Sequence, residues 1–107
     1  MAERKVIWSS RAKIDLQEIL DFFYSRNGTK TYSKKLNVTF RKSVRLLARH
    51  SDIGNPTDIQ NVRCLIEGDY SIFYKLESNT IEILTIWDSR QNPDHLSIFT
   101  GPKVELL

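Results

Sequence analysis

The apolar residues in the first half of the chain recur at the spacing of α-helices. They are three or four positions apart, which places them on one face of each helix. Helices are therefore predicted over about 10–27 and about 30–49, with Ser9 or Ser10 capping the first and Asn27-Gly28 ending it. Because only two or three residues join them, the helices form an antiparallel hairpin. The two apolar stripes are Ala12, Leu16, Ile19, Leu20 and Phe23, then Tyr32, Leu36, Phe40, Val44 and Leu47.

The second half of the chain has the pattern of β-strands. The runs 62–66, 70–76 and 80–87 are rich in β-branched and aromatic residues, and the short segments between them are typical of tight turns. Two-residue turns pair Arg63 with Tyr74 and put Tyr70, Ile72, Ile83 and Trp87 on the face that receives the helices. Cys64, Ser71, Phe73, Leu84 and Ile86 are then on the other face, and a longer first turn exchanges Arg63 and Cys64.

Together these elements predict one α+β domain with the order β-α-α-β-β-β. The first strand is Val6-Ile7-Trp8, and 50–61 is predicted as a loop. The helix hairpin covers a mainly antiparallel four-stranded sheet. Of the 107 residues, about 5–96 form the core and 97–107 a tail.

Cysteine content and hydropathy limit the class of protein. Cys64, the single cysteine, cannot form an internal disulfide. No apolar run approaches the roughly 20 residues of a membrane span, and no signal peptide is recognisable. We therefore expect a cytoplasmic protein without membrane contact.

Charge is distributed unevenly between the two halves. Residues 1–49 contain twelve Lys and Arg against four acids, whereas residues 50–107 contain four against nine. No acid occurs from Phe22 to Ser51. On the second helix the basic residues lie opposite the apolar stripe, with Val38 among them. This face is either a solvated surface or a binding site for an acidic partner.

Four motifs follow one another along the chain. They are Val6-Ile7-Trp8-Ser9 with Ala12-x-x-Asp15-Leu16-x-x-Ile19, then Val62-Arg63-x-Leu65, then Gly68-Asp69-Tyr70-x-Ile72-Phe73-Tyr74, then Ile83-Leu84-x-Ile86-Trp87-Asp88-Ser89-Arg90-Gln91-x-Pro93. In order and spacing they resemble the RelE/ParE superfamily of toxins from bacterial type II toxin–antitoxin modules. The resemblance implies a compact toxin that is wrapped and neutralised by a cognate antitoxin.

The resemblance implies one of two activities. RelE-like members cut mRNA on the ribosome without a metal, and ParE-like members bind DNA gyrase. RNA cutting needs several cations that converge on one phosphate. In the RNA-cutting relatives these cations lie on the outer face of the sheet, where the matching positions here hold Val62, Cys64 and Ser71. This departure favours the ParE-like activity, with the ribosome and mRNA as the alternative target.

The candidate site residues differ between the two activities. If the chain cuts RNA, Arg90, Arg63 and His95 are the catalytic candidates, although Arg63 is also placed to hydrogen-bond the 50–61 loop. No metal-ligand spacing or cofactor motif is present, so none is predicted. The residues predicted to bind a protein partner are Lys34, Lys35, Val38, Arg41, Lys42, Arg45, Arg90 and Gln91.

Overall fold

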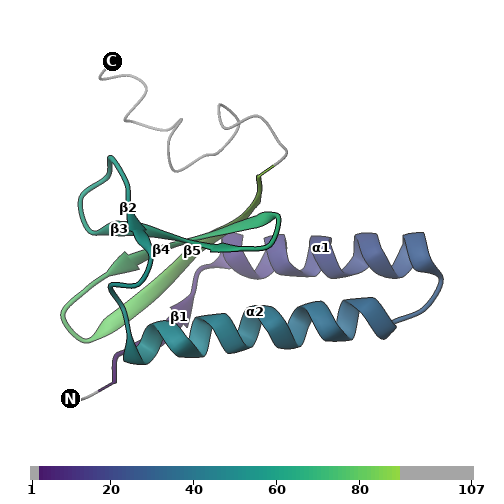
Figure 1. Ribbon diagram of the computed structural model, residues 1–107, viewed down its shortest axis with the longest axis horizontal. Helices are drawn as coiled ribbons and strands as arrows, with labels where there is room; N and C mark the ends of the chain where they lie inside the picture. Colours follow the sequence, from purple (N-terminus) through teal and green to yellow (C-terminus); the bar gives the residue numbers. More distant parts are fainter. Residues whose placement is uncertain (1–2, 90–107) are drawn as a thin grey trace.

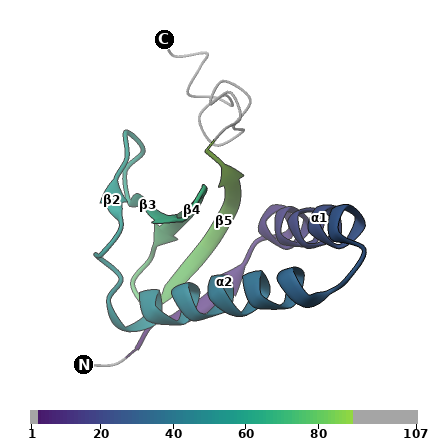
Figure 2. The ribbon, with the colours of Figure 1, turned by 45° about the vertical axis from the view of Figure 1, so that its right-hand side comes forward.

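The computed structural model describes residues 3–89, which form a helix layer on one face of a five-stranded sheet. The elements are β1 (Lys5–Trp8), α1 (Ser10–Asn27), α2 (Thr31–Arg49), β2 (Asn55–Pro56), β3 (Val62–Glu67), β4 (Tyr70–Leu76) and β5 (Thr80–Asp88). The helices run side by side in opposite directions, on the same side of the sheet (Figures 1 and 2). The predicted α+β class and helix hairpin are confirmed, whereas the predicted tail lies outside the described residues.

The sheet has the strand order β1-β5-β4-β3-β2. β1 pairs with β5 in parallel, and all other neighbours are antiparallel. The predicted count of four strands was wrong, because β2 pairs Asn55 with Cys64 and Pro56 with Arg63. Gly54 permits this close approach, since a Cβ there would lie 2.9 Å from the carbonyl oxygen of Cys64. Proline is tolerated because β2 is an edge strand.

Both ends of α1 have the predicted caps. The Ser9 hydroxyl accepts a hydrogen bond from the Ala12 N–H at 3.0 Å. At the other end Gly28 has a φ of 71°, and its N–H donates to the carbonyl of Tyr24. The helix therefore stops where the chain must turn into α2.

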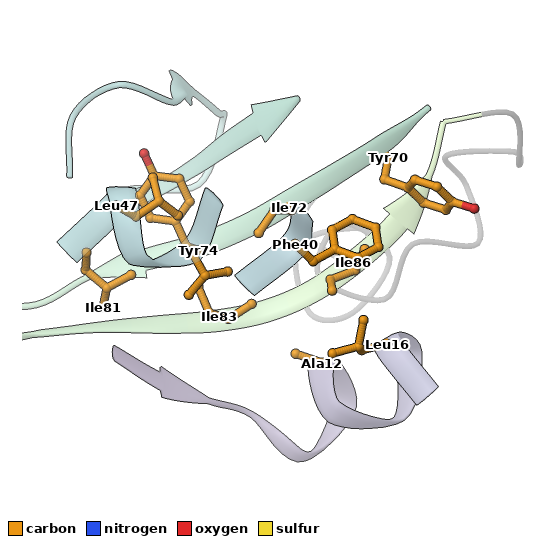
Figure 3. Close-up of a cluster of buried hydrophobic side chains, with 11 residues drawn as sticks. Ala12, Leu16, Phe40, Leu47, Tyr70, Ile72, Tyr74, Ile81, Ile83 and Ile86 are labelled. Carbon is orange, nitrogen blue, oxygen red and sulfur yellow. The ribbon is translucent and has the colours of Figure 1, made fainter. Parts of the chain in front are cut away.

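The main core lies between the helix layer and the sheet. Figure 3 shows Ala12 and Leu16 of α1 and Phe40 of α2 pointing toward the strands. Replacing Phe40, which is completely buried, by Ala would cost about 3–5 kcal/mol. The largest fully buried side chains are Tyr74, Phe40, Leu47, Ile72, Ile81 and Ile83.

A β-bulge in β5 changes which residues face the helices. The register pairs Phe73 with Thr85 and Tyr74 with Ile83, so Leu84 is an extra residue in β5. Beyond it Ile86 packs in the main core and Trp87 packs with the residues of the opposite face. The predicted faces of Ile86 and Trp87 were therefore wrong, because one extra residue reverses the alternation.

Side chains at the start of α1 satisfy the backbone of this bulge. One carboxylate oxygen of Asp15 accepts from the Ile86 N–H at 3.2 Å and from the Thr85 hydroxyl. The other accepts from Arg11, at 2.7 Å from Nη2. The Ser9 hydroxyl donates to the Leu84 carbonyl at 2.8 Å. Because Asp15 is only 8% exposed, these bonds link α1 firmly to the register of β5.

Candidate partner-binding surfaces

The outer sheet face is the side of β3, β4 and β5 that points away from the helices. Its centre is apolar: Val62 and Phe73 are buried, and Cys64, Leu84 and Trp87 pack against them. Of these three strands, the part described here places one cation on this face, Lys75, and it lies opposite Glu82. Lys5 lies on the edge strand β1, separated from β3 by β5 and β4. The outer sheet face consists of Val62, Cys64, Ile66, Ser71, Phe73, Lys75, Glu82, Leu84 and Trp87.

The three positions that the resemblance assigns to phosphate-binding cations lie on this face without a positive charge. Val62 is 4% exposed and packs with Phe73. The Ser71 hydroxyl is hydrogen-bonded to that of Ser89 at 3.3 Å. Burial raises the pKa of the Cys64 thiol, so the group stays protonated at neutral pH. These side chains do not form a cluster of donors for a phosphate.

Arg63 is turned away from the outer sheet face and holds the loop before β2. Its Nη1 donates to the carbonyl oxygens of Gly54 at 2.6 Å and Asp52 at 3.2 Å. The Tyr74 hydroxyl donates to the Ser51 carbonyl at 2.9 Å and accepts from the Gly54 N–H at 2.9 Å. Burial raises the pKa of Tyr74, which keeps this hydroxyl neutral. The hydrogen bonds expected from Arg63 to the loop are therefore present.

The remaining RNA-cutting candidates cannot be placed. Arg90, Gln91 and His95 lie outside the described residues, so their catalytic and partner-binding roles stay predictions. Within the described range, no group of three His, Cys, Asp or Glu side chains is arranged to hold a metal ion. The described helices also include none that is long and apolar enough to cross a bilayer.

The exposed side of α2 is the second candidate surface, and we call it the basic stripe. It contains all six residues of the helix that were predicted to contact a partner, and each is exposed. The guanidinium of Arg41 lies 5.6 Å from the centre of the Trp8 ring, and its Nε donates to Asn37 at 3.1 Å. Arg49 extends the surface and pairs with Glu3 at 3.2 Å. The basic stripe consists of Lys34, Lys35, Val38, Arg41, Lys42, Arg45 and Arg49.

Sequence reasoning missed the groove beside the bulge. This hollow of about 320 Å³ lies between α1 and the end of the sheet, with Phe22 and Trp87 in its wall and Arg11 and Glu18 at its charged side. An acid at position 15 within an apolar helix stripe, four residues after an arginine, was the available signal for a buried carboxylate paired with Arg11. The position of Trp87 depends on the bulge, which has no such signal.

Comparison with known proteins identifies the class of this chain. Residues 6–93 match the family model described as the ParE toxin of the type II toxin-antitoxin system, parDE. Because the match spans most of the sequence, the chain belongs to the ParE toxin family. This finding confirms the resemblance to the RelE/ParE superfamily and makes the chain a toxin of the type II class. No curated protein sequence is detectably similar to it.

The solved structures that share the fold include the following three. A chain of the chromosomal ParDE system from P. aeruginosa has a TM-score of 0.68 and 24% identity, covering 78% of this chain and 94% of its own. A chain of the RelBE2 complex from Mycobacterium tuberculosis has a TM-score of 0.61 and 17% identity, covering 82% and 93%. A chain of the E. coli DinJ-YafQ complex has a TM-score of 0.51 and 12% identity, covering 80% and 92%.

Proposed function

We propose that this toxin inhibits growth in the cytoplasm by binding a protein target of the DNA gyrase type, and that a cognate antitoxin neutralises it. The observation that carries the proposal is the chemistry of the outer sheet face. That face has an apolar centre, with Lys75 beside Glu82 at one end. The match to the ParE family supports the ParE-like mode of action, and the toxin–antitoxin systems to which the similar structures belong support a cognate antitoxin.

An apolar face fits a protein target better than a phosphate. Cleavage of RNA develops negative charge on the phosphate, which preorganised donors must stabilise. Val62, the Cys64 thiol and the Ser71 hydroxyl supply no positive charge there. By contrast, exposed apolar groups such as Ile66, which is 55% exposed, release water when a protein covers them.

The antitoxin is the second proposed partner. The similar structures from P. aeruginosa, M. tuberculosis and E. coli belong to toxin–antitoxin systems. We extend this association to the present chain, whose excess of basic residues in the first half suits an acidic partner. A small gene next to the toxin gene that restores growth on co-expression would support this assignment.

Two parallel assays with the purified protein test the mode of action. In the first, gyrase supercoils a relaxed plasmid with and without the toxin. In the second, ribosomes translate a message that is then mapped by primer extension. We expect inhibition of supercoiling and an intact message. Cleavage at A-site codons that is abolished by Arg90→Ala would contradict the proposal and establish the alternative, a ribosome-dependent mRNA endonuclease.

A further inference from the structure

The basic stripe has an apolar residue at its centre. Val38 is 60% exposed, more than any other large apolar side chain in the described part of the chain. Its nearest neighbours on a helix surface are three and four positions away, and all four are cations: Lys34, Lys35, Arg41 and Lys42. An apolar contact point is thus surrounded by positive charge.

We propose that the basic stripe binds an acidic amphipathic helix of the cognate antitoxin. In this complex an apolar side chain of the antitoxin covers Val38, and its carboxylates lie against the surrounding cations. The inference rests on the proposed function only in naming the antitoxin as the source of the helix. It goes further by assigning the surface and the chemistry of the segment that binds there.

The cations of the basic stripe are available to a partner. In the described part of the chain, Lys34, Lys35, Lys42 and Arg45 form no ion pair. Arg41 is held by Trp8 and Asn37 through its ring contact and its Nε, which leaves its terminal nitrogens for a carboxylate. A guanidinium fixed in this way binds a carboxylate with less loss of side-chain entropy.

A second apolar contact lies two turns further along α2. Leu46 is 46% exposed and lines a groove of about 560 Å³ together with Val6 and Ala48. Lys42, Arg45 and Arg49 line the same groove together with Glu3, which pairs with Arg49, so two cations without an ion pair in the described part of the chain, Lys42 and Arg45, border its apolar floor. Val38 and Leu46 are eight residues apart, a distance of about 12 Å along the helix axis.

This arrangement matches a helix better than a nucleic acid. Phosphates are bound by cations and polar hydrogen-bond donors, and neither Val38 nor Leu46 can contribute to such a contact. A helix that carries two apolar residues about two turns apart, with Glu or Asp beside each, satisfies both the apolar points and the cations. From Lys34 to Arg49 the stripe is about 22 Å long, so about four turns of the partner cover it.

The test measures binding of a synthetic helical peptide to the full-length toxin by fluorescence anisotropy at low salt. The peptide has about 20 residues, with two Leu placed about two turns apart and Glu at the flanking positions. The stripe variant is Lys42→Glu with Arg45→Glu. Its control is Lys5→Glu with Arg26→Glu, which makes the same change in net charge at exposed positions outside the basic stripe.

We expect the stripe variant to weaken peptide binding by about tenfold or more, and the control to change it by about twofold or less. A peptide with Lys in place of Glu should bind the stripe variant better than the unmodified toxin, and the circular dichroism spectra of the two proteins should coincide, which shows that the variant is folded. Val38→Ser should weaken binding without changing the net charge.

Several results would overturn the inference. One is an equal loss in the stripe and control variants, which would show attraction by net charge alone. Another is tighter binding of duplex DNA than of the peptide at the same salt concentration. A third is unchanged affinity of the cognate antitoxin for the stripe variant. Gyrase is absent from these measurements, so none of them bears on the proposed mode of action.

Discussion

The outer sheet face and the basic stripe lie on opposite layers of the molecule and differ in chemistry. The outer sheet face has an apolar centre of Val62, Phe73 and Trp87, and its strand residues include Lys75 opposite Glu82. The basic stripe places cations around Val38 and contains no acid. Under the two proposals, binding to the first surface depends on the release of water from exposed apolar groups such as Ile66, because Val62 and Phe73 are already buried, and binding to the second depends on charge. The proposals thus assign separate surfaces of one small fold to two kinds of partner.

The two surfaces also depend on the fold in different ways. The basic stripe follows from the helical periodicity of α2 alone, because residues three and four positions apart share one side. The outer sheet face depends on the bulge at Leu84, which places Trp87 there, and on the bonds from Asp15 that stabilise it. Disturbing the bulge should therefore alter the first surface and leave the second intact.

Among the changes that bear on the two surfaces, the largest effect is expected from Asp15→Ala. This change leaves the Ile86 N–H and the Thr85 hydroxyl without their acceptor in a buried place. The free energy of unfolding should fall by about 3 kcal/mol, as measured by urea denaturation. Asp21→Ala is the control, because Asp21 accepts one exposed hydrogen bond from Gln17 and should cost about 0.5 kcal/mol. Similar losses in the two variants would contradict the role given to Asp15.

A smaller effect is expected from Ile66→Glu on the outer sheet face. A carboxylate there must be desolvated when the target covers it, so the affinity for gyrase should fall about tenfold, or about 1.4 kcal/mol. Ile14→Glu changes a residue of similar exposure on α1, 49% against 55%, and should leave the affinity nearly unchanged. Surface plasmon resonance measures both. A greater loss of affinity in Ile14→Glu than in Ile66→Glu would show that gyrase binds a surface other than the outer sheet face.

The dependence on salt should separate the two surfaces. Raising the ionic strength from about 0.1 M to about 1 M shortens the Debye length from about 10 Å to about 3 Å. Binding of the acidic peptide should therefore weaken several-fold, and binding of gyrase should change little. Titrations with each partner at increasing salt give the slope of the logarithm of the affinity against the logarithm of the salt concentration for each surface. Equal slopes would mean that the surfaces do not differ in the way described.

The smallest effect concerns the Cys64 thiol. Because burial raises its pKa, the thiolate fraction at pH 8 is lower than that of free cysteine. Reaction with a disulfide reagent should accordingly be slower, and the rate should continue to rise above the pH at which free cysteine levels off. The absorbance of the released thiol follows this reaction. Levelling at or below that pH would contradict the buried, protonated state.

Much of the fold could be predicted from local patterns. The helix stripes, the Ser9 and Gly28 caps and the two-residue turn between β3 and β4 follow from periodicity and turn chemistry, and all are present. The pairing of Arg63 with Tyr74 was likewise correct. These features depend on neighbours in sequence, which is why the sequence alone predicts them.

The remaining features depend on contacts between distant segments. The backbone around the extra residue Leu84 is satisfied by the N-cap Ser9 and by Asp15 of α1, about 70 positions away in sequence. β2 pairs with β3 where Gly54 fits closely beside Tyr74 and Cys64. It was not predicted, because Asn55-Pro56 has no strand pattern. For the same reason the prediction placed Trp87 on the wrong face of the sheet, whereas it placed the cations of α2 correctly on the exposed side of the helix.

The central claim is that the outer sheet face contacts a protein target and not RNA. The most direct measurement is a methyl NMR titration of the toxin, labelled at the isoleucine methyl groups, with gyrase and separately with a short RNA. The account predicts that the Ile66 signal broadens with gyrase while the Ile14 signal does so less, and that RNA leaves both unchanged. Perturbation of Ile66 by RNA, with no response to gyrase, would contradict it.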